Sequence, residues 1–189
     1  MSEEQEDYLW RRRHRVLRRV EISVCYHRKR ERFFEFLDRG VKAIAIIGSS
    51  IAFADLLRVV GGGLALKICA ATVAVTTTIS LVFGFAERAR QHSEIARAFL
   101  ELEAQIVARG ERSFDENDLD LWEARVRTLE ASEPAALNAL VVVCQNEIAI
   151  AAGNIPTHIP WYQRLLAHFW SFSVPHDKSK DPKPANDRA

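Results

Sequence analysis

The chain has 189 residues, of which 48% are hydrophobic and 27% charged, and its formal net charge is +1. So small a charge gives no reason to propose nucleic acid as a partner, because that binding depends on an excess of positive charge. The charged side chains are nevertheless segregated, since residues 43–54 and 68–86 contain none. Segregation of this kind is typical of a membrane protein.

Residues 1–40 are predicted to form a basic amphipathic helix. From Gln5 to Arg39 there is no Pro or Gly, and apolar residues recur at helical spacing, which fits one long helix or two in succession. Between Arg11 and Arg32, ten Lys or Arg residues stand against two Glu. Such a run is usually a solvated helix face, but here it precedes an apolar segment, where positive charge sets membrane topology.

Residues 41–86 are predicted to form a two-span transmembrane hairpin. The second segment, Ile68–Ala86, is an uncharged helix of roughly 28 Å, close to the roughly 30 Å thickness of the hydrocarbon core. The first segment, 41–60, includes Asp55 and Arg58 and is a weaker span. If both segments cross, both basic flanks lie in the cytoplasm, as the positive-inside tendency requires.

The topology is assigned to basic residues on either side of the hairpin: Arg28, Lys29, Arg30, Arg32, Arg88 and Arg90. They predict a protein of the bacterial inner membrane with both termini in the cytoplasm. At the tip, Asp55 and Lys67 lie at similar depth on either side of Gly62 and are predicted to pair or share water. A pair would reduce the cost of a carboxylate near the hydrocarbon edge, on the order of 1 to 3 kcal/mol. The alternative is that both are hydrated among the outer headgroups.

Small and hydroxyl-bearing residues recur every four positions in the second segment, at Thr72, Thr76, Ser80 and Gly84. The first segment has a comparable face that includes Gly48. Small residues let membrane helices approach closely, which favours helix packing. The alternative is that several hairpins assemble with these hydroxyls around an aqueous path. Packing is the more common role of such stripes.

Residues 87–153 are predicted to form a cytoplasmic helical region. Gly110 ends a first helix, and the acids of SFDENDLDLW (113–122) cover the first turn of the next. The two helices carry apolar seams at Ile95, Phe99, Leu102 and Ile106, and at Leu119, Trp122, Val126 and Leu129. Ala135–Gly153 is predicted to be the core helix of the bundle, since its polar side chains make it a poor membrane span.

Asn146 and Glu147 interrupt that apolar helix and are candidate buried polar residues. A buried Glu147 would require a cation, for which Arg28, Arg30 and Arg88 are candidates. The alternative is that Glu147 faces water. Farther on, 154–174 is predicted to form an aromatic amphipathic helix that either lies along the headgroups or closes the bundle. The polar, proline-bearing tail, 175–189, is predicted to be disordered.

The candidates for catalytic or metal chemistry are weak. His92 lacks a second histidine at i+4, as a helical zinc-protease motif needs. The pairs Cys25 with His27 and Cys144 with Glu147 lack the repeated spacing of zinc sites. We therefore expect no catalytic residue, no cofactor and no metal, and we expect that the protein is not an enzyme.

Three stretches resemble the SLATT family of two-span membrane effectors from prokaryotic conflict systems, over approximately Leu9–Gly153. They are YHRKRERFF (26–34) before the hairpin, ERARQHSEIARAFLELEAQI directly after it, and CQNE (144–147) in the late helix. The resemblance implies an oligomeric effector that damages the membrane of its host when an infection signal arrives. It also implies a partner that synthesises or senses a nucleotide signal, and it supplies no catalytic residues.

The expected protein is thus all-α, with a long N-terminal helix, a membrane hairpin and a cytoplasmic helical bundle. Its expected function is that of an inner-membrane effector, a homo-oligomer in the lipid bilayer that perturbs or permeabilises the membrane in an anti-phage or conflict system. The alternative is a non-catalytic, membrane-anchored scaffold. A third reading is a soluble all-helical protein with two buried helices.

Overall fold

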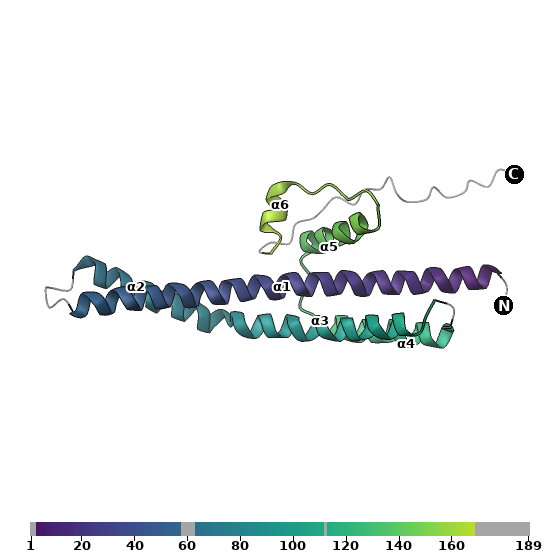
Figure 1. The fold of residues 1–189 in the computed structure, drawn as a ribbon, viewed down its shortest axis with the longest axis horizontal. Helices are drawn as coiled ribbons and strands as arrows, with labels where there is room; N and C mark the ends of the chain where they lie inside the picture. The colour runs from purple at the N-terminus through teal and green to yellow at the C-terminus, as the bar shows by residue number, and fades with distance from the viewer. Residues whose placement is uncertain (1–2, 58–62, 112, 169–189) are drawn as a thin grey trace. The chain divides into compact units, whose positions relative to one another are not determined.

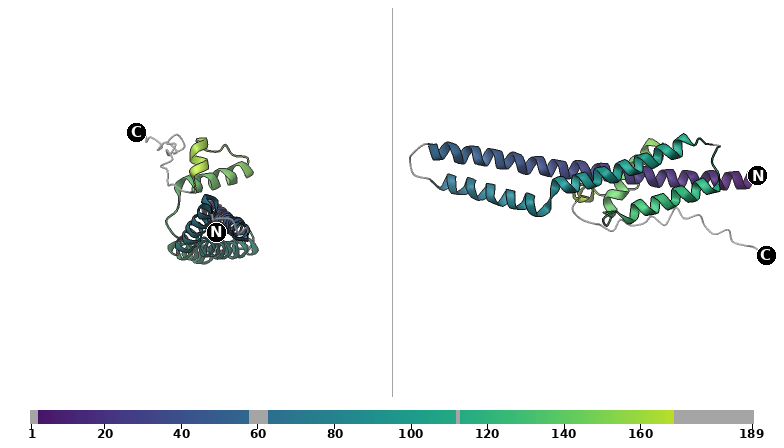
Figure 2. Two further views of the ribbon diagram at one scale, coloured as in Figure 1. Left: turned by 90° about the vertical axis from the view of Figure 1, so that its left-hand side faces the viewer. Right: turned by 90° about the horizontal axis from the view of Figure 1, so that it is seen from below.

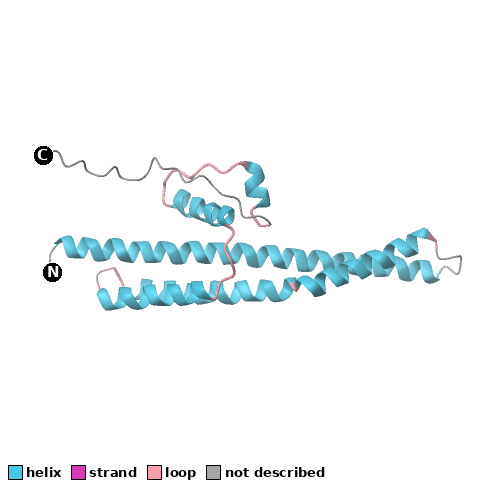
Figure 3. Cartoon of the chain, turned by 180° about the vertical axis from the view of Figure 1, so that it is seen from behind, coloured by secondary structure: helices cyan, strands magenta, loops and turns pink. Residues whose placement is uncertain are grey.

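The computed structural model describes residues 3–57, 63–111 and 113–168, without the side chains of 51–57, 65, 66 and 165. All regular secondary structure in these residues is helical, which confirms the all-α prediction (Figure 3). The chain divides into two compact units, Met1–Pro134 and Ala135–Ala189.

Unit 1 contains four helices: α1 (Glu3–Leu57), α2 (Leu64–Phe83), α3 (Phe85–Ala108) and α4 (Glu116–Ala131). Helix α2 returns along the C-terminal part of α1, and α3 continues along its N-terminal part (Figure 1). The expected boundary at residue 40 is not an element boundary, because α1 is one helix of 55 residues. A single Gly40 is insufficient to end it, since an internal glycine costs a helix only about 0.5 to 1 kcal/mol.

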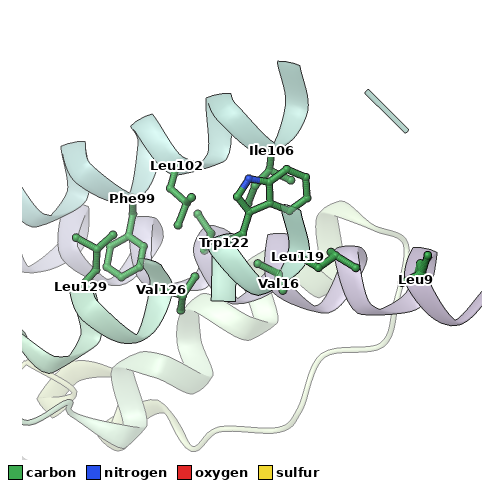
Figure 4. Packing of buried hydrophobic residues seen from close by; sticks show 10 residues of the cluster. Leu9, Val16, Phe99, Leu102, Ile106, Leu119, Trp122, Val126 and Leu129 are labelled. Atoms are coloured by element: carbon green, nitrogen blue, oxygen red, sulfur yellow. The ribbon is translucent and has the colours of Figure 1, made fainter. Parts of the chain in front are cut away.

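The hydrophobic core of unit 1 lies where α1, α3 and α4 meet (Figure 4). Both apolar seams expected from helical spacing face this core, with Phe99, Ile106 and Leu119 fully buried. From α1, Leu9, Val16 and Val20 complete it. The amphipathic helices predicted after residue 87 are therefore confirmed, and they pack on the N-terminal part of α1.

The connection between α3 and α4 follows the local sequence signals. Gly110 adopts the left-handed conformation (φ 79°) just after α3, as the sequence predicts. Asp115 caps α4, because its carboxylate accepts the backbone N–H of Asp118 at 2.8 Å. The Asp118 side chain accepts the N–H of Asp115 in return, which completes a capping box.

The basic face of α1 is partly neutralised by acids of α4. Arg12 donates to Asp120 at 2.6 Å and to Glu123 at 2.8 Å. Arg19 donates to Glu130 in the same way. The bonds to Glu123 and Asp120 raise the pKa of Arg12, and the bond from Arg12 lowers that of Glu123. Part of the excess positive charge between residues 11 and 32 therefore holds α4 in place.

Unit 2 contains α5 (Asn138–Ala151) and the short α6 (Trp161–Leu166), which pack on each other. Gly153 (φ 74°) follows the end of helix α5, and the N–H of Asn154 donates to the carbonyl of Ala149 at 2.8 Å. Described helix covers only a small part of the amphipathic segment expected over 154–174. The tail 175–189 lies outside the described residues.

Candidate functional site

The surface that α2 and the C-terminal part of α1 present is apolar. Counted through the bend at Gly84, Lys67–Ala108 is the one helix in the described residues that is long and apolar enough to cross a membrane. None of its most apolar 18-residue window is buried. The exposed large side chains are Ile44, Ile46 and Ile47 on α1, and Leu64, Ile68, Val75, Ile79, Leu81, Val82 and Phe83 on α2.

The two helices approach each other closely at Gly48 of α1. A Cβ atom added there would lie only 2.8 Å from Cγ2 of Val73 and 3.8 Å from the carbonyl oxygen of Cys69. Gly48 is buried while its neighbours Ile47 and Ser49 are exposed. The contact between α1 and α2 therefore requires the smallest residue, as in helix pairs that associate without a large apolar core.

The small-residue stripe of α2 does not share one environment. Thr76 and Ser80 are half-buried on the side of Val73, whereas Thr72 is exposed. Residues four apart drift around a helix of 3.6 residues per turn, which explains the difference. The hydroxyls of Thr72 and Thr76 each donate to the carbonyl four residues back, at 2.8 Å.

Gly84 occupies a backbone conformation that favours glycine. Its φ of 56° and ψ of 47° are left-handed, and α2 ends there while α3 begins at once. Figure 2 shows the change of direction where α2 passes into α3. A Cβ atom on Gly84 would meet nothing within 4 Å. The backbone at the bend, rather than crowding, therefore requires glycine.

The pairing of Asp55 with Lys67 at the tip of the predicted hairpin stays a prediction. Lys67 is exposed at the start of α2. The side chain of Asp55, residue Arg58 and Gly62 lie outside what the structure describes.

The basic residues that are predicted to set the topology fall into two groups. Arg28 and Arg90 donate to acids on their own helices, Glu31 at 3.1 Å and Glu87 at 3.2 Å. Arg32 is exposed and Lys29 is half-buried. Exposed pairs within one helix contribute only about 0.3 to 0.5 kcal/mol, so Arg28 and Arg90 remain available to hydration and headgroups.

Arg30 of α1 and Arg88 of α3 instead converge on one aromatic ring. Their guanidinium carbons lie 4.5 Å and 5.9 Å from the ring centroid of Phe34. Burial lowers the pKa of Arg30, and the positive charge of Arg88 lowers it further. The ring of Phe34 also lies parallel to that of His92, at 5.6 Å.

Next to Phe34, two buried histidines join α1 to α3. Nδ1 of His27 lies 2.8 Å from Nδ1 of His92, and the side chains are 0% and 5% exposed. Nε2 of His27 lies 3.0 Å from Oε1 of Glu133, just beyond α4, although the approach is not that of a hydrogen bond. The ring of Phe99 stacks on the ring of His27, with a centroid distance of 6.0 Å.

This geometry limits how many protons the pair can hold. Two facing Nδ1 atoms need one proton between them, so a neutral pair or a pair with one charged ring keeps the contact. If both rings were charged, two donors would face each other. At an effective dielectric constant of about 20, two charges 5.1 Å apart also repel by roughly 3 kcal/mol.

Burial is the main cause that holds His92 neutral. It lowers the pKa of His92 to about 4, and His27, Arg30 and Arg88 act in the same direction. Glu31 opposes them weakly. On the other side of the pair, the carboxylate of Glu133 lies beside His27.

The two polar residues of α5 have different environments. Asn146 is half-buried and holds the backbone of Thr157 with two bonds of 2.7 Å. Glu147 is exposed, which agrees with the alternative that it faces water and gives no support to burial against a cation. Glu147 directly follows Asn146 and therefore lies on another face of α5, so the two side chains can differ in burial.

The His27–His92 contact was not predicted from the sequence. His92 lacks the second histidine of a helical zinc motif, and His27 with Cys25 lacks the spacing of a zinc site, so neither residue stands out locally. In the described residues, no group of three His, Cys, Asp or Glu side chains is placed to hold a metal ion. Comparison of the chain with protein-family models, with curated proteins and with solved structures found no match.

Proposed function

We propose that this protein is an integral membrane effector whose α2 and C-terminal part of α1 form a hairpin in the bacterial inner membrane. The observation that carries the proposal is the uncovered apolar surface of α2. A core helix of a soluble protein of this hydropathy would be buried, yet none of the spanning window of α2 is. At 20 residues, α2 is about 30 Å long, which matches the hydrocarbon core.

The shared core of unit 1 supports a hairpin rather than a single crossing. Helix α3 follows α2 directly and packs its Phe99 and Ile106 against the N-terminal part of α1. Segments that share one core lie on the same side of a membrane. If α2 crosses, the C-terminal part of α1 must therefore cross as well. Arg28, Arg88 and Arg90 then flank the hairpin on one side, which the positive-inside tendency makes cytoplasmic.

As the molecular activity, we propose that copies of the chain assemble and permeabilise the membrane when a signal arrives through a partner. The small and hydroxyl-bearing residues of α1 and α2 support close assembly of helices in lipid. The half-buried hydroxyls of Thr76 and Ser80 are the candidates to line a path for ions once hairpins rearrange.

A membrane-anchored scaffold is the second candidate, and one observation favours it. The hydroxyls of Ser49, Ser50, Thr72, Thr76 and Thr78 all donate to carbonyls of their own helices. Hydroxyls bonded in this way are satisfied in lipid without any aqueous path.

Permeability measurements separate the two candidates. The chain is expressed in bacteria and its location is determined by fractionation, while a potential-sensitive dye reports depolarisation. Thr76→Val removes a half-buried hydroxyl with almost no change of volume, and Thr78→Val is the matched control on the exposed face of the same helix.

An effector predicts that the chain depolarises cells, that Thr76→Val weakens depolarisation and that Thr78→Val does not. If the chain is recovered in the membrane but neither it nor the variants depolarise cells, with or without phage infection as the trigger, the scaffold is correct. Recovery in the supernatant without detergent would overturn both.

A further inference from the structure

The contact between His27 and His92 is placed where it can regulate how α1 and α3 pack. It joins the two helices in the polar part of unit 1, between the apolar core around Phe99 and the apolar surface of α2. Because both rings are buried, any change in their charge must be accommodated by the helices themselves rather than by water.

We propose that His27 and His92 form a proton-sensitive latch, which holds α1 against α3 while at most one ring is charged and opens when both are. This property belongs to the contact of α1 with α3, so it stands whether or not α2 crosses a membrane.

The charged groups around the pair favour the closed state. From α1, Arg30 and Glu31 face His92, and from α3, Arg88 does. Beyond α4, Glu133 faces His27 at 3.0 Å. One carboxylate therefore lies beside His27, whereas two guanidiniums oppose a proton on His92.

The direction of the pH effect follows from proton binding. An unfolded chain protonates His92 near its ordinary pKa of 6.5, but the folded chain does so only near 4. The unfolded or opened chain therefore binds more protons between these values, and the closed contact loses stability as the pH falls from about 6.5 to 4. Above pH 6.5 the contribution of His92 is complete.

The first test follows the histidines directly. Nitrogen-15 NMR of the whole chain, labelled in its histidines and held in detergent micelles, reports the charge of each ring. We expect His92 to stay neutral below pH 5, well under the ordinary histidine pKa of 6.5. A midpoint of His92 at that ordinary value would overturn the proposal.

A second test changes the pH at which His92 becomes charged. Arg88→Gln removes an exposed positive charge that faces His92, and Arg97→Gln removes one from the exposed face of the same helix beside Glu101. We expect the midpoint of His92 to rise in Arg88→Gln and to stay unchanged in Arg97→Gln. The same midpoint in both variants would contradict control of the latch by its charged neighbours.

The third test measures opening by hydrogen exchange of backbone amides around His27 and His92. His92→Phe cannot be charged and suits the parallel packing on Phe34, whereas His14→Phe is the control at an exposed position. Protection factors of wild type and of His14→Phe should fall together as the pH drops through about 5 to 4. In His92→Phe they should persist to lower pH.

Carboxylates also titrate in this range, but they do so in all three proteins, so the difference between variants is the readout. Loss of protection at the same pH in His92→Phe would refute the latch. If His92→Phe does not fold, exchange in Arg88→Gln and Arg97→Gln decides. Removal of Arg88 narrows the gap between the pKa of His92 in the closed and in the opened chain, so Arg88→Gln alone should keep its protection to lower pH.

Discussion

The two ends of unit 1 place their apolar side chains on opposite sides of the helices. Where α1 meets α3 and α4, residues such as Phe99 and Leu119 are inside and the charged side chains lie around them. Where α1 meets α2, the contact is made at Gly48, and large side chains such as Leu81 point outward, 85% exposed. One continuous helix, α1, takes part in both arrangements.

The difference reflects what drives helices together in each environment. In water, burial of apolar area is the main driving force, so the large side chains gather between α1, α3 and α4. Lipid is as apolar as leucine, so helices gain little by hiding large side chains and associate through close packing of small ones. The α1–α2 contact is of this kind, because it is made by the small residue Gly48 while the large side chains are exposed.

The largest expected effect concerns the core between α1, α3 and α4. Phe99→Ala removes a fully buried ring and should lower the free energy of unfolding by about 3 to 5 kcal/mol. Phe36→Ala, at a ring that is 73% exposed on α1, is the control and should change it by no more than about 0.5 kcal/mol. Denaturation followed by circular dichroism in detergent measures both, and equal losses would refute the assignment of inside and outside.

The next effect concerns the outward face of α2. Val75→Arg places a charge near the middle of the proposed span, which costs membrane insertion about 2.5 to 3.5 kcal/mol. We expect this variant to be depleted from the membrane fraction and degraded. Leu121→Arg, at a similarly exposed apolar position of α4, should leave the amount in the membrane unchanged. Normal membrane recovery of Val75→Arg would argue that α2 does not cross.

A smaller effect is expected at the contact between α1 and α2. Gly48→Ala brings a methyl group against the stiff side chain of Val73 and should destabilise the helix pair by about 1 to 3 kcal/mol. The double variant with Val73→Ala removes the clash and should recover most of that loss. Thermal unfolding in detergent gives the coupling energy, and strictly additive effects would contradict a direct contact.

The smallest effects concern two glycines with free space around them. Gly84→Ala forces an alanine into the left-handed region and should cost about 1 to 2 kcal/mol. Gly40→Ala lies in the regular helix α1 and should instead stabilise it by about 0.5 to 1 kcal/mol. The midpoint temperature of thermal unfolding should thus fall in Gly84→Ala and rise in Gly40→Ala. A stabilised Gly84→Ala would mean that the bend is dispensable.

The periodicity of apolar residues predicted α3 and α4, which pack on α1, well. The seams Ile95–Ile106 and Leu119–Leu129 carry a repeated signal, and each residue only had to lie on the correct face of its own helix. The end of α3 at Gly110 and the cap of α4 depend on residues within a few positions, so the sequence was sufficient for them as well.

Features that depend on contacts between distant residues could not be predicted in this way. His27 and His92 are 65 residues apart, and neither position differs locally from a satisfied core histidine. Arg12 and Glu123 are 111 residues apart, so the basic run of α1 looked like a solvated face. The apolar neighbours of Glu147 along the chain leave its burial open, because one position along a helix turns a side chain by about 100° and the local sequence does not say which face is covered.

The uninterrupted course of α1 has a mechanical consequence. Its 55 residues form a helix of roughly 82 Å. Arg12 and Arg19 bind α4 near one end of it, and Val73 of α2 lies against it toward the other end. A rotation of α1 about its own axis would carry Gly48 away from Val73 and turn Ile47 or Ser49 into the gap, which is too narrow for either. The α1–α2 contact therefore fixes the rotational setting of α1.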